Sequence, residues 1–515
     1  MANRPIEKWW DKRMLVLLLA IMMMATMSSP ASANNHKTGF LTDEDAAITL
    51  TGGGSVTPII NSGEIVGDFT FEGLPDGIGM KPGQGHNTVE VYVAHEQTTV
   101  PFFGTADFEN ASIAKLTLST APGHEGEVLS AEVVLSSDDG YLRFCSATMV
   151  GPDEGFKKYT LFANEEANDI VDVGTGAPYG SDPSLDPQRQ AGFAVALDTT
   201  NDKSKPIVGL GRLNHENTIV VPGDWKNQLA MLTTDDTFSG PSAQLYLYLA
   251  KNDREVWRDQ GTLWAFRATA KNGVTVDPTD PFNGANDYLD IRPGDDLQGE
   301  FIPVPDDVAD GTTGVAPQQA LEDWSNANNV FQFIRLEDLD YDRNNHRVVY
   351  VADTGRTRVI PDPTTGRLMR GPGGTTGQAD NGSIFRFVFN EDDPKLVDSL
   401  TVIAQGDDAG LGGFVGFVNP DNMGTSTNSL MVQEDADNAR IWRYDLGSNW
   451  TVVATVNDPD GESTGIVDAS KWYGPGSWLL NVQAHGSFES EELQPDGTLL
   501  KREDGQLILM RIPGS

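Results

Sequence analysis

The sequence predicts an all-β fold, namely a six-bladed β-propeller with a long insertion loop and few short helices. Three observations lead to this prediction. Short segments rich in Val, Leu, Ile, Tyr and Phe recur along the chain, bounded by Gly, Asp, Asn and Pro, as β-strands are. One three-part pattern occurs six times. Helical periodicity is scarce, and the one helix that we expect covers residues 317–333.

The repeated pattern is a turn-rich or acidic element, then an apolar strand that ends in polar residues, then a second apolar strand. Its six instances begin at LPDGIGM, LRFCSAT, GRLNHENT, FIRLEDLDYD, FVNPDNMG and TGIVDASK. Equivalent units packed around one axis leave few exposed strand edges, and they bring equivalent loops to one end of a central channel. A two-sheet sandwich is the alternative fold, but it does not explain six equivalent units.

The beginning of the chain and one interruption suggest its organisation. A basic start, the apolar run MLVLLLAIMMMATM and the small-residue pattern SSPASA predict a signal peptide over residues 1–33, cut after Ala33. We expect residues 34–64 to be an N-terminal extension and residues 65–515 to be a single propeller domain that carries the site. The Pro-, Gly- and Asp-rich segment 275–316 is expected to be the insertion loop. The protein is thus expected to be periplasmic or secreted, without stable membrane insertion.

The charge balance restricts the partners. The chain has 36 basic and 75 acidic residues and a formal net charge of −39, which argues against non-specific binding of nucleic acid. An acidic protein also repels anionic substrates, unless bound cations reverse the local field. The single cysteine, Cys145, has no partner for an internal disulfide. It is either a small buried hydrophobic residue or a metal ligand.

The six repeats place polar side chains at equivalent turns, which a propeller would bring together at the mouth of its channel. These residues are Asp76, His95, Glu96, Cys145, Glu165, Glu166, Asn214, His215, Glu216, Asp235, Asp236, Arg335, Glu337, Asp338, Asp353, Asp421, Asn422, Glu434, Asp435, Glu462, Asp468 and His485. Many carboxylates cannot share a small space unless cations neutralise them. Carboxylate oxygens suit calcium, and a thiolate suits iron or zinc. The alternative is that each acid is an ordinary solvated turn residue.

One arginine stands out among these acids. Arg335 lies in FIRLEDLDYD, close to Glu337 and Asp338. A guanidinium binds two oxygens of a phosphate, and metal ions neutralise the others, so this combination indicates phosphoryl transfer. The sequence contains no HExxH or GxxxxGK[ST] motif that would indicate a competing site.

The ordered motifs RFCSAT, FANEE, GRLNHENT, FIRLEDLDYD, NPDNM and VQEDAD resemble those of the PhoX-type alkaline phosphatases, over roughly residues 65–512. The resemblance implies an exported six-bladed propeller that hydrolyses phosphate monoesters with iron and calcium. It further implies a small phosphorylated substrate, and we expect a monomer. The alternatives are a phytase or phosphodiesterase that uses calcium alone, and a non-catalytic extracellular propeller stabilised by calcium.

The resemblance also implies roles for individual residues. Arg335 would hold the substrate phosphate, and Glu337 is the second expected catalytic residue. Cys145 would bind iron, while Glu216 and Glu337 would bridge metals. The full set of expected metal ligands is Cys145, Glu165, Glu166, Glu216, Glu337, Asp421 and Glu434.

Overall fold

The computed structural model describes residues 39–101, 104–172, 188–226, 228–237, 241–312, 316–377, 379–408 and 416–514. The predicted signal peptide, residues 1–33, lies outside these residues. Within the described ranges, no helix combines the length and the apolar character needed to span a membrane.

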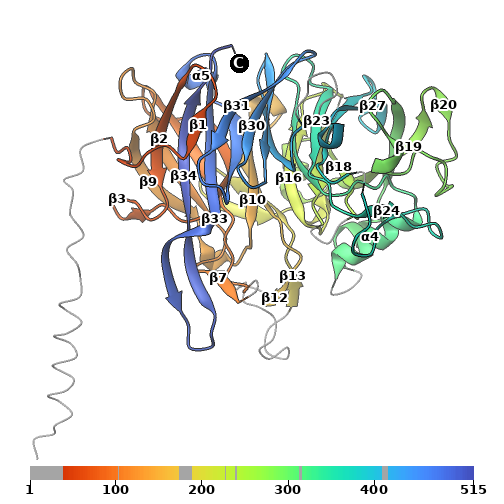
Figure 1. Cartoon of the computed structure of the whole chain (residues 1–515), viewed down its shortest axis with the longest axis horizontal. Helices are drawn as coiled ribbons and strands as arrows, with labels where there is room; N and C mark the ends of the chain where they lie inside the picture. Colours follow the sequence, from red (N-terminus) through yellow and green to blue (C-terminus); the bar gives the residue numbers. More distant parts are fainter. Residues whose placement is uncertain are drawn as a thin grey trace, which may run out of the picture. The chain divides into compact units, whose positions relative to one another are not determined.

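The prediction of a mostly-β fold with six strand repeats is confirmed (Figure 1), and each repeat forms four antiparallel strands. Repeat 1 consists of β5 (Pro75–Pro82), β6 (Thr88–His95), β8 (Ser112–Ser119) and β9 (Val128–Leu135). Repeat 2 consists of β10 (Phe144–Val150), β11 (Thr160–Glu165), β14 (Ala194–Asp198) and β15 (Lys203–Pro206). Repeat 3 consists of β16 (His215–Val221), β17 (Leu229–Asp235), β18 (Leu245–Ala250) and β19 (Thr262–Lys271). Repeat 4 consists of β22 (Leu336–Tyr341), β23 (Val348–Asp353), β26 (Ser383–Phe389) and β27 (Leu396–Gln405). Repeat 5 consists of β28 (Pro420–Thr425), β29 (Ser429–Glu434), β30 (Arg440–Asp445) and β31 (Trp450–Val456). Repeat 6 consists of β32 (Gly461–Asp468), β33 (Ser477–Leu493), β34 (Leu499–Arg511) and β2 (Ser55–Asn61).

The first strands of the six repeats form a closed ring. Each first strand contacts the first strand of the next repeat, in the order β5, β10, β16, β22, β28 and β32, and β32 contacts β5 again. Six apolar clusters fill the spaces between successive repeats, so each sheet is buried on both faces. Neighbouring residues of one strand enter different clusters: Leu161 packs between repeats 1 and 2, whereas Phe162 packs between repeats 2 and 3. This arrangement explains why the strands are nearly continuous apolar runs.

The predicted N-terminal extension covers residues 34–64, and its described part, from residue 39 on, contributes strands to the sheets. Its strand β2 pairs with β34 and supplies the outer strand of repeat 6. The short strand β1 (Ile48–Leu50) pairs with β31 at the edge of repeat 5. In Figure 1 these red strands lie beside the blue C-terminal strands. The two ends of residues 39–514 are therefore joined by hydrogen bonds, which closes the ring of sheets.

The predicted insertion loop, residues 275–316, is only partly a loop. It contains β21 (Leu297–Pro303) and the short helices η4 (Tyr288–Asp290) and α3 (Asp306–Ala309). Because β21 pairs with both β19 and β27, it joins repeats 3 and 4 into one sheet. The predicted helix at 317–333 forms as α4 (Pro317–Ala327) but ends earlier. The next residues run irregularly, and Phe333 forms a bridge with Ala243.

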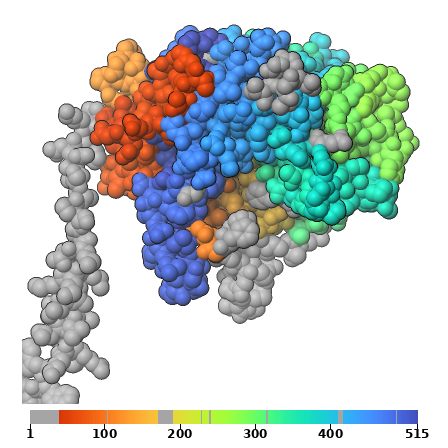
Figure 2. Space-filling view, viewed as in Figure 1, coloured from red at the N-terminus to blue at the C-terminus, as the bar shows by residue number. Residues whose placement is uncertain are grey.

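The remaining elements are short and lie between or outside the repeats. The strands are β3 (Ile65–Val66), β4 (Phe69–Thr70), β7 (Thr105–Asp107), β12 (Ile170–Asp172), β13 (Gln188–Gln190), β20 (Val274–Thr275), β24 (Val359–Pro361) and β25 (Leu368–Arg370). The helices are η1 (Ser137–Asp139), η2 (Pro152–Glu154), α2 (Asp253–Arg258), η3 (Val208–Leu210), η5 (Gly406–Asp408) and α5 (Ser470–Tyr473). The far part of the β33–β34 hairpin projects from the body of the molecule, with β7 paired alongside it (Figure 2).

Candidate metal centre

Five of the six innermost strands carry an irregularity at the same point. In β5, β10, β16, β22 and β28, the register against the neighbouring strand shifts directly after the first paired residue. A β-bulge of this kind re-aims the side chain of the extra residue. The residue that directly follows the first paired residue, and so begins the bulge, is Asp76 in β5, Cys145 in β10, Glu216 in β16, Glu337 in β22 and Asp421 in β28.

The second strands add acids at the same end of the repeats. Glu96, Glu166, Asp236 and Asp435 each follow directly after the last residue of β6, β11, β17 or β29. Repeat 6 contributes Glu462, the second residue of β32. The sequence predicts all five of these residues at the channel mouth, but it predicts only Glu166 among them as a metal ligand.

These ten residues form one chain of overlapping groups, which we call the acid ring. Within each group, one possible ligand atom per residue lies within 4.8 Å of the others. The groups are Asp76–Glu96–Cys145, Cys145–Glu166–Glu216, Glu166–Asp236–Glu337, Glu216–Glu337–Asp421 and Asp421–Asp435–Glu462. Five residues belong to two groups each, so neighbouring groups share ligands: Cys145, Glu166, Glu216, Glu337 and Asp421. The structure therefore brings together five of the seven predicted ligands.

Several ring oxygens have no hydrogen-bond partner although they are buried. Both carboxylate oxygens of Glu216 are in this condition, and the side chain is 0% exposed. Oδ1 of Asp76 and Oε1 of Glu337 also accept no hydrogen bond. A buried carboxylate without partners is costly, because it has lost its water and gained nothing in return. Cations bound between these oxygens would remove that cost, so the donor set fits metal ions.

The electrostatics lead to the same conclusion. Burial, followed by the negative charge of Asp421 and Glu337, raises the pKa of Glu216 well above its ordinary value. Burial and the neighbouring acids Glu166 and Glu216 raise the pKa of the Cys145 thiol as well. Both shifts favour the protonated forms of these groups when no cation is bound. Metal ions displace such protons, so binding would be accompanied by proton release.

Arg335 lies within the acid ring and is held by it. Its Nε donates to Asp236 Oδ1 at 2.7 Å, and its Nη2 donates to Asp236 Oδ2, which is a two-pronged contact. Nη2 also lies 3.3 Å from Glu337 Oε1. Although burial opposes the charge, Asp236 and Glu337 keep the pKa of Arg335 above its ordinary value. The guanidinium is therefore a fixed positive charge among the acids.

A histidine lies at the repeat 6 side of the ring, between two acids. His485 Nε2 is 3.6 Å from Glu462 Oε1, and its Nδ1 is 3.5 Å from Glu503 Oε1. Although burial opposes it, these two acids raise the pKa of His485 well above its ordinary value. A cavity of about 720 Å³ lies beside this residue, lined also by Asp435, Arg440 and Glu462.

The structure does not bring the predicted ligands Glu165 and Glu434 into the acid ring. Glu165 accepts hydrogen bonds from the backbone N–H groups of Leu142, Gly192 and Phe193 at 2.9–3.2 Å. Glu434 accepts from the Val418 N–H, from Trp442 Nε1 and from the Arg440 guanidinium. Their oxygens are thus occupied in fixing the chain next to the ring.

A positional signal separates the two kinds of acid. In repeats 2 and 5, the last residue of the second strand caps backbone N–H groups, and the next residue enters the acid ring. Repeat 4 follows the first half of this rule, since Asp353 accepts from the N–H groups of Ile334, Arg335 and Gly355. Aligning the six repeats on the ends of their second strands would have identified Glu96, Asp236 and Asp435.

The sequence identity between this chain and similar solved structures is low. A mutant of an α-L-arabinofuranosidase from Fusarium graminearum is 10% identical, with 85% of this chain and 93% of that chain covered and a TM-score of 0.37. The aldose sugar dehydrogenase from Streptomyces coelicolor is 10% identical, with 89% and 100% covered and a TM-score of 0.31. A neuraminidase-like protein of a flat-faced bat influenza virus is 8% identical, with 86% and 89% covered and a TM-score of 0.32. No curated protein matches the chain.

The family comparison is specific. The model of the family described as alkaline phosphatase PhoX matches residues 147–463, which is more than half of the chain. The matched range includes Glu166, Glu216, Arg335, Glu337 and Asp421, and Cys145 lies two residues before it. The chain therefore belongs to the alkaline phosphatase PhoX family, a membership that implies phosphomonoesterase activity.

Proposed function

We propose that this protein is an exported, metal-dependent phosphatase that hydrolyses phosphate monoesters at the acid ring, using iron, calcium and Arg335. The observation that supports this most strongly is Glu216. Its two carboxylate oxygens are buried and lack hydrogen bonds, and they lie where two of the candidate metal groups meet. A carboxylate in this condition is what a metal-bridging ligand requires.

We further propose that the six repeats are the blades of a six-bladed β-propeller. The closed order of the first strands and the apolar clusters between all successive repeats support this architecture. In such a fold the acid ring surrounds the axis. This placement explains how residues as distant in sequence as Asp76 and Glu462 can be linked by one chain of overlapping groups.

The donor types support two classes of metal. Two of the five groups contain Cys145, and a thiolate favours a transition metal such as iron. The other three groups contain only carboxylates, which favour calcium. Cys145 therefore has the role of a shared iron ligand in this proposal, and Glu216 and Glu337 have that of bridging ligands.

When bound, the metals would polarise the phosphate oxygens and supply a nucleophile of lowered pKa. The protein side chains have complementary tasks. Arg335 binds the charge of the phosphate oxygens, and this charge is redistributed as the phosphoryl group transfers. Asp236 fixes the plane of the guanidinium by its two-pronged contact. Glu337 contacts Arg335 and belongs to two of the candidate metal groups, so it connects the anion-binding residue to the ligands.

The remaining parts of the proposal concern partners and location. The substrate would be a small phosphorylated molecule, since the net charge of −39 disfavours nucleic acid. The predicted leader places the protein in the periplasm or outside the cell, without stable insertion in a membrane and as a monomer. Because the chain has one cysteine, no internal disulfide can form, so stability outside the cell would come from the core and from bound metal.

The test is hydrolysis of p-nitrophenyl phosphate at alkaline pH by wild type and C145S, with and without a chelator. We expect a rate in wild type that the chelator abolishes and added iron plus calcium restores. C145S should lose iron and most of its rate, while calcium binding remains. A chelator-resistant rate, or C145S with full iron and full rate, would contradict the proposal.

A further inference from the structure

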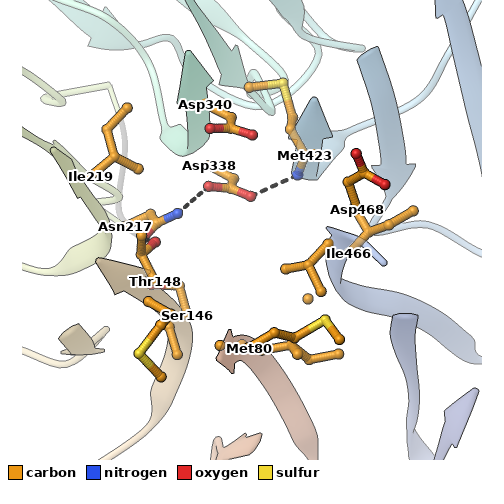
Figure 3. Close-up of a pocket in the computed structure, with 18 of the residues that line it drawn as sticks. Met80, Ser146, Thr148, Asn217, Ile219, Asp338, Asp340, Met423, Ile466 and Asp468 are labelled. Carbon is orange, nitrogen blue, oxygen red and sulfur yellow. Dashed lines mark hydrogen bonds between the residues drawn. The ribbon is translucent and has the colours of Figure 1, made fainter. Parts of the chain in front are cut away.

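A hydrogen-bonded layer lies directly beneath the acid ring. Asn217 and Asp338 follow Glu216 and Glu337 in sequence, and each lies in the same register shift as its neighbour. Asn217 Nδ2 donates to Asp338 Oδ1, which links repeats 3 and 4. Asp338 Oδ2 accepts from the Met423 N–H of repeat 5 at 2.7 Å (Figure 3).

The layer continues into repeat 2. Asn217 Oδ1 accepts from Thr148 Oγ1 at 3.0 Å. Ser146, the residue after Cys145, donates from its Oγ to the backbone oxygen of Glu216. We call Ser146, Asn217, Asp338 and the Met423 N–H the belt. It connects the chain immediately after Cys145, Glu216 and Glu337 with repeat 5.

The belt separates the acid ring from a cavity of about 320 Å³. Ser146, Asn217 and Asp338 line this cavity, and Figure 3 shows their side chains around the open space. A bulged strand that is not tied down could relax into such a space, and its ligand side chain would move with it. Asn217 and Asp338 are both buried, so loss of their contact would leave a donor and an acceptor without their protein partner.

We propose that Asn217 and Asp338 are positioning residues, whose mutual hydrogen bond sets where Glu216 and Glu337 present their carboxylates to the metals. This inference rests on the proposed function, because it requires that the acid ring binds metals. Residues that orient metal ligands from behind commonly change metal affinity by about 10–100-fold when replaced. Neither residue needs to touch the metals or the substrate.

The experiment is a reciprocal exchange of the two side chains. N217D puts two carboxylates face to face. D338N replaces one carboxylate oxygen by an NH2 group, so either the Met423 N–H or Asn217 Nδ2 faces a donor instead of an acceptor. The double variant N217D/D338N restores a donor opposite an acceptor, with the Met423 N–H facing an amide oxygen, and it has the wild-type charge. Each protein is loaded with iron and calcium and dialysed against increasing chelator, and the retained metals are counted by elemental analysis.

We expect both single variants to lose metal at about 10-fold lower chelator, and the double variant to recover to within about 3-fold of wild type. The kcat of the single variants should fall and recover with excess metal. Opposite shifts in the two single variants would show that only charge matters, because N217D adds a negative charge and D338N removes one. Such opposite shifts, unchanged metal retention or a double variant without recovery would each overturn the inference.

D340N is the matched control. Asp340 lines the same cavity and is buried like Asp338, but its oxygens bind Thr425 and Arg343 instead of the belt. We expect D340N to lower thermal stability and to leave metal retention unchanged. If D340N lost metal as D338N does, the effect would be one of general stability, and the positioning role would be wrong. A wild type that retains no metal would instead contradict the proposed function.

Discussion

The acid ring and the cavity beneath it contain the same kind of side chain in opposite conditions. In the ring, Glu216 has no hydrogen bond on either oxygen. Below it, Asp338 accepts from Asn217 and the Met423 N–H. Asp340 accepts from the N–H and hydroxyl of Thr425 and from Arg343. The two regions are one residue apart on the same strands.

This difference shows how ligand acids can be told from structural acids. All of these carboxyl groups are buried, and burial raises the pKa of Asp338, to about 7, as it raises that of Glu216. Hydrogen-bond partners distinguish them, because a structural acid has its acceptors filled by the protein. Glu216 instead has both oxygens left for something that the chain does not supply, although this does not hold for every ring acid, since Asp236 accepts from Arg335.

The largest expected effect comes from removing the arginine of each region. R335A should retain its fold and metals but lose about 10²–10³-fold in kcat, because the charge that stabilises the transferring phosphoryl group is gone. R343A, in the cavity wall, removes the partner of Asp340 and should reduce stability with little change in kcat. Steady-state kinetics and thermal unfolding of the two variants measure both effects. Equal losses of kcat would contradict the distinction between the regions.

The next effect compares two adjacent acids in repeat 5. E434Q should lower the free energy of unfolding by about 2–3 kcal/mol, because Arg440 loses its ion pair and backbone N–H groups lose a charged acceptor. D435N should instead lose one bound metal and keep its stability in the presence of chelator. Denaturant unfolding and elemental analysis separate the outcomes. Metal loss in E434Q without destabilisation would show that the assignment of these neighbours is reversed.

The smallest effect is a dependence of metal-free stability on pH. Most acids of the ring have pKa values above their ordinary ones, about 8 for Asp435, mainly because of Glu462 and burial. Glu462 is the exception, because, although burial opposes this, His485 lowers its pKa. Groups with a raised folded pKa stabilise the protein fully below about pH 4 and lose this contribution as pH rises through the folded pKa. We therefore expect the metal-free protein to melt a few degrees lower at pH 8 than at pH 5. The metal-loaded protein should show a smaller decrease, and equal decreases in both forms would contradict the account.

Much of the fold could be predicted from the sequence, because strand alternation and turn residues act locally. The two apolar strands expected in each repeat correspond to β6 and β8 in repeat 1, and to equivalent strands in the others. The turn-rich element expected before them forms a strand as well, which is β5 in repeat 1. The pairing of β2 with β34 could not be predicted, since it joins segments more than 440 residues apart. The strand β21 was hidden in a segment whose composition is typical of loops.

The site was predictable to a similar degree. Cys145, Glu216 and Glu337 were identified by their motifs, and each lies at a register shift. The choice between Glu434 and Asp435 was not possible from motifs alone, because adjacent residues of a strand point to opposite sides and only the strand end decides which one enters the ring. The belt also escaped detection, since its bonds join residues from four different repeats.

The most direct test of the central claim is elemental analysis of purified wild type beside E216Q and D340N. We predict iron and calcium in wild type and D340N, and loss of metal in E216Q with its fold intact by circular dichroism. Wild type without a transition metal, or E216Q with the full metal content, would contradict the assignment of the acid ring as a metal centre.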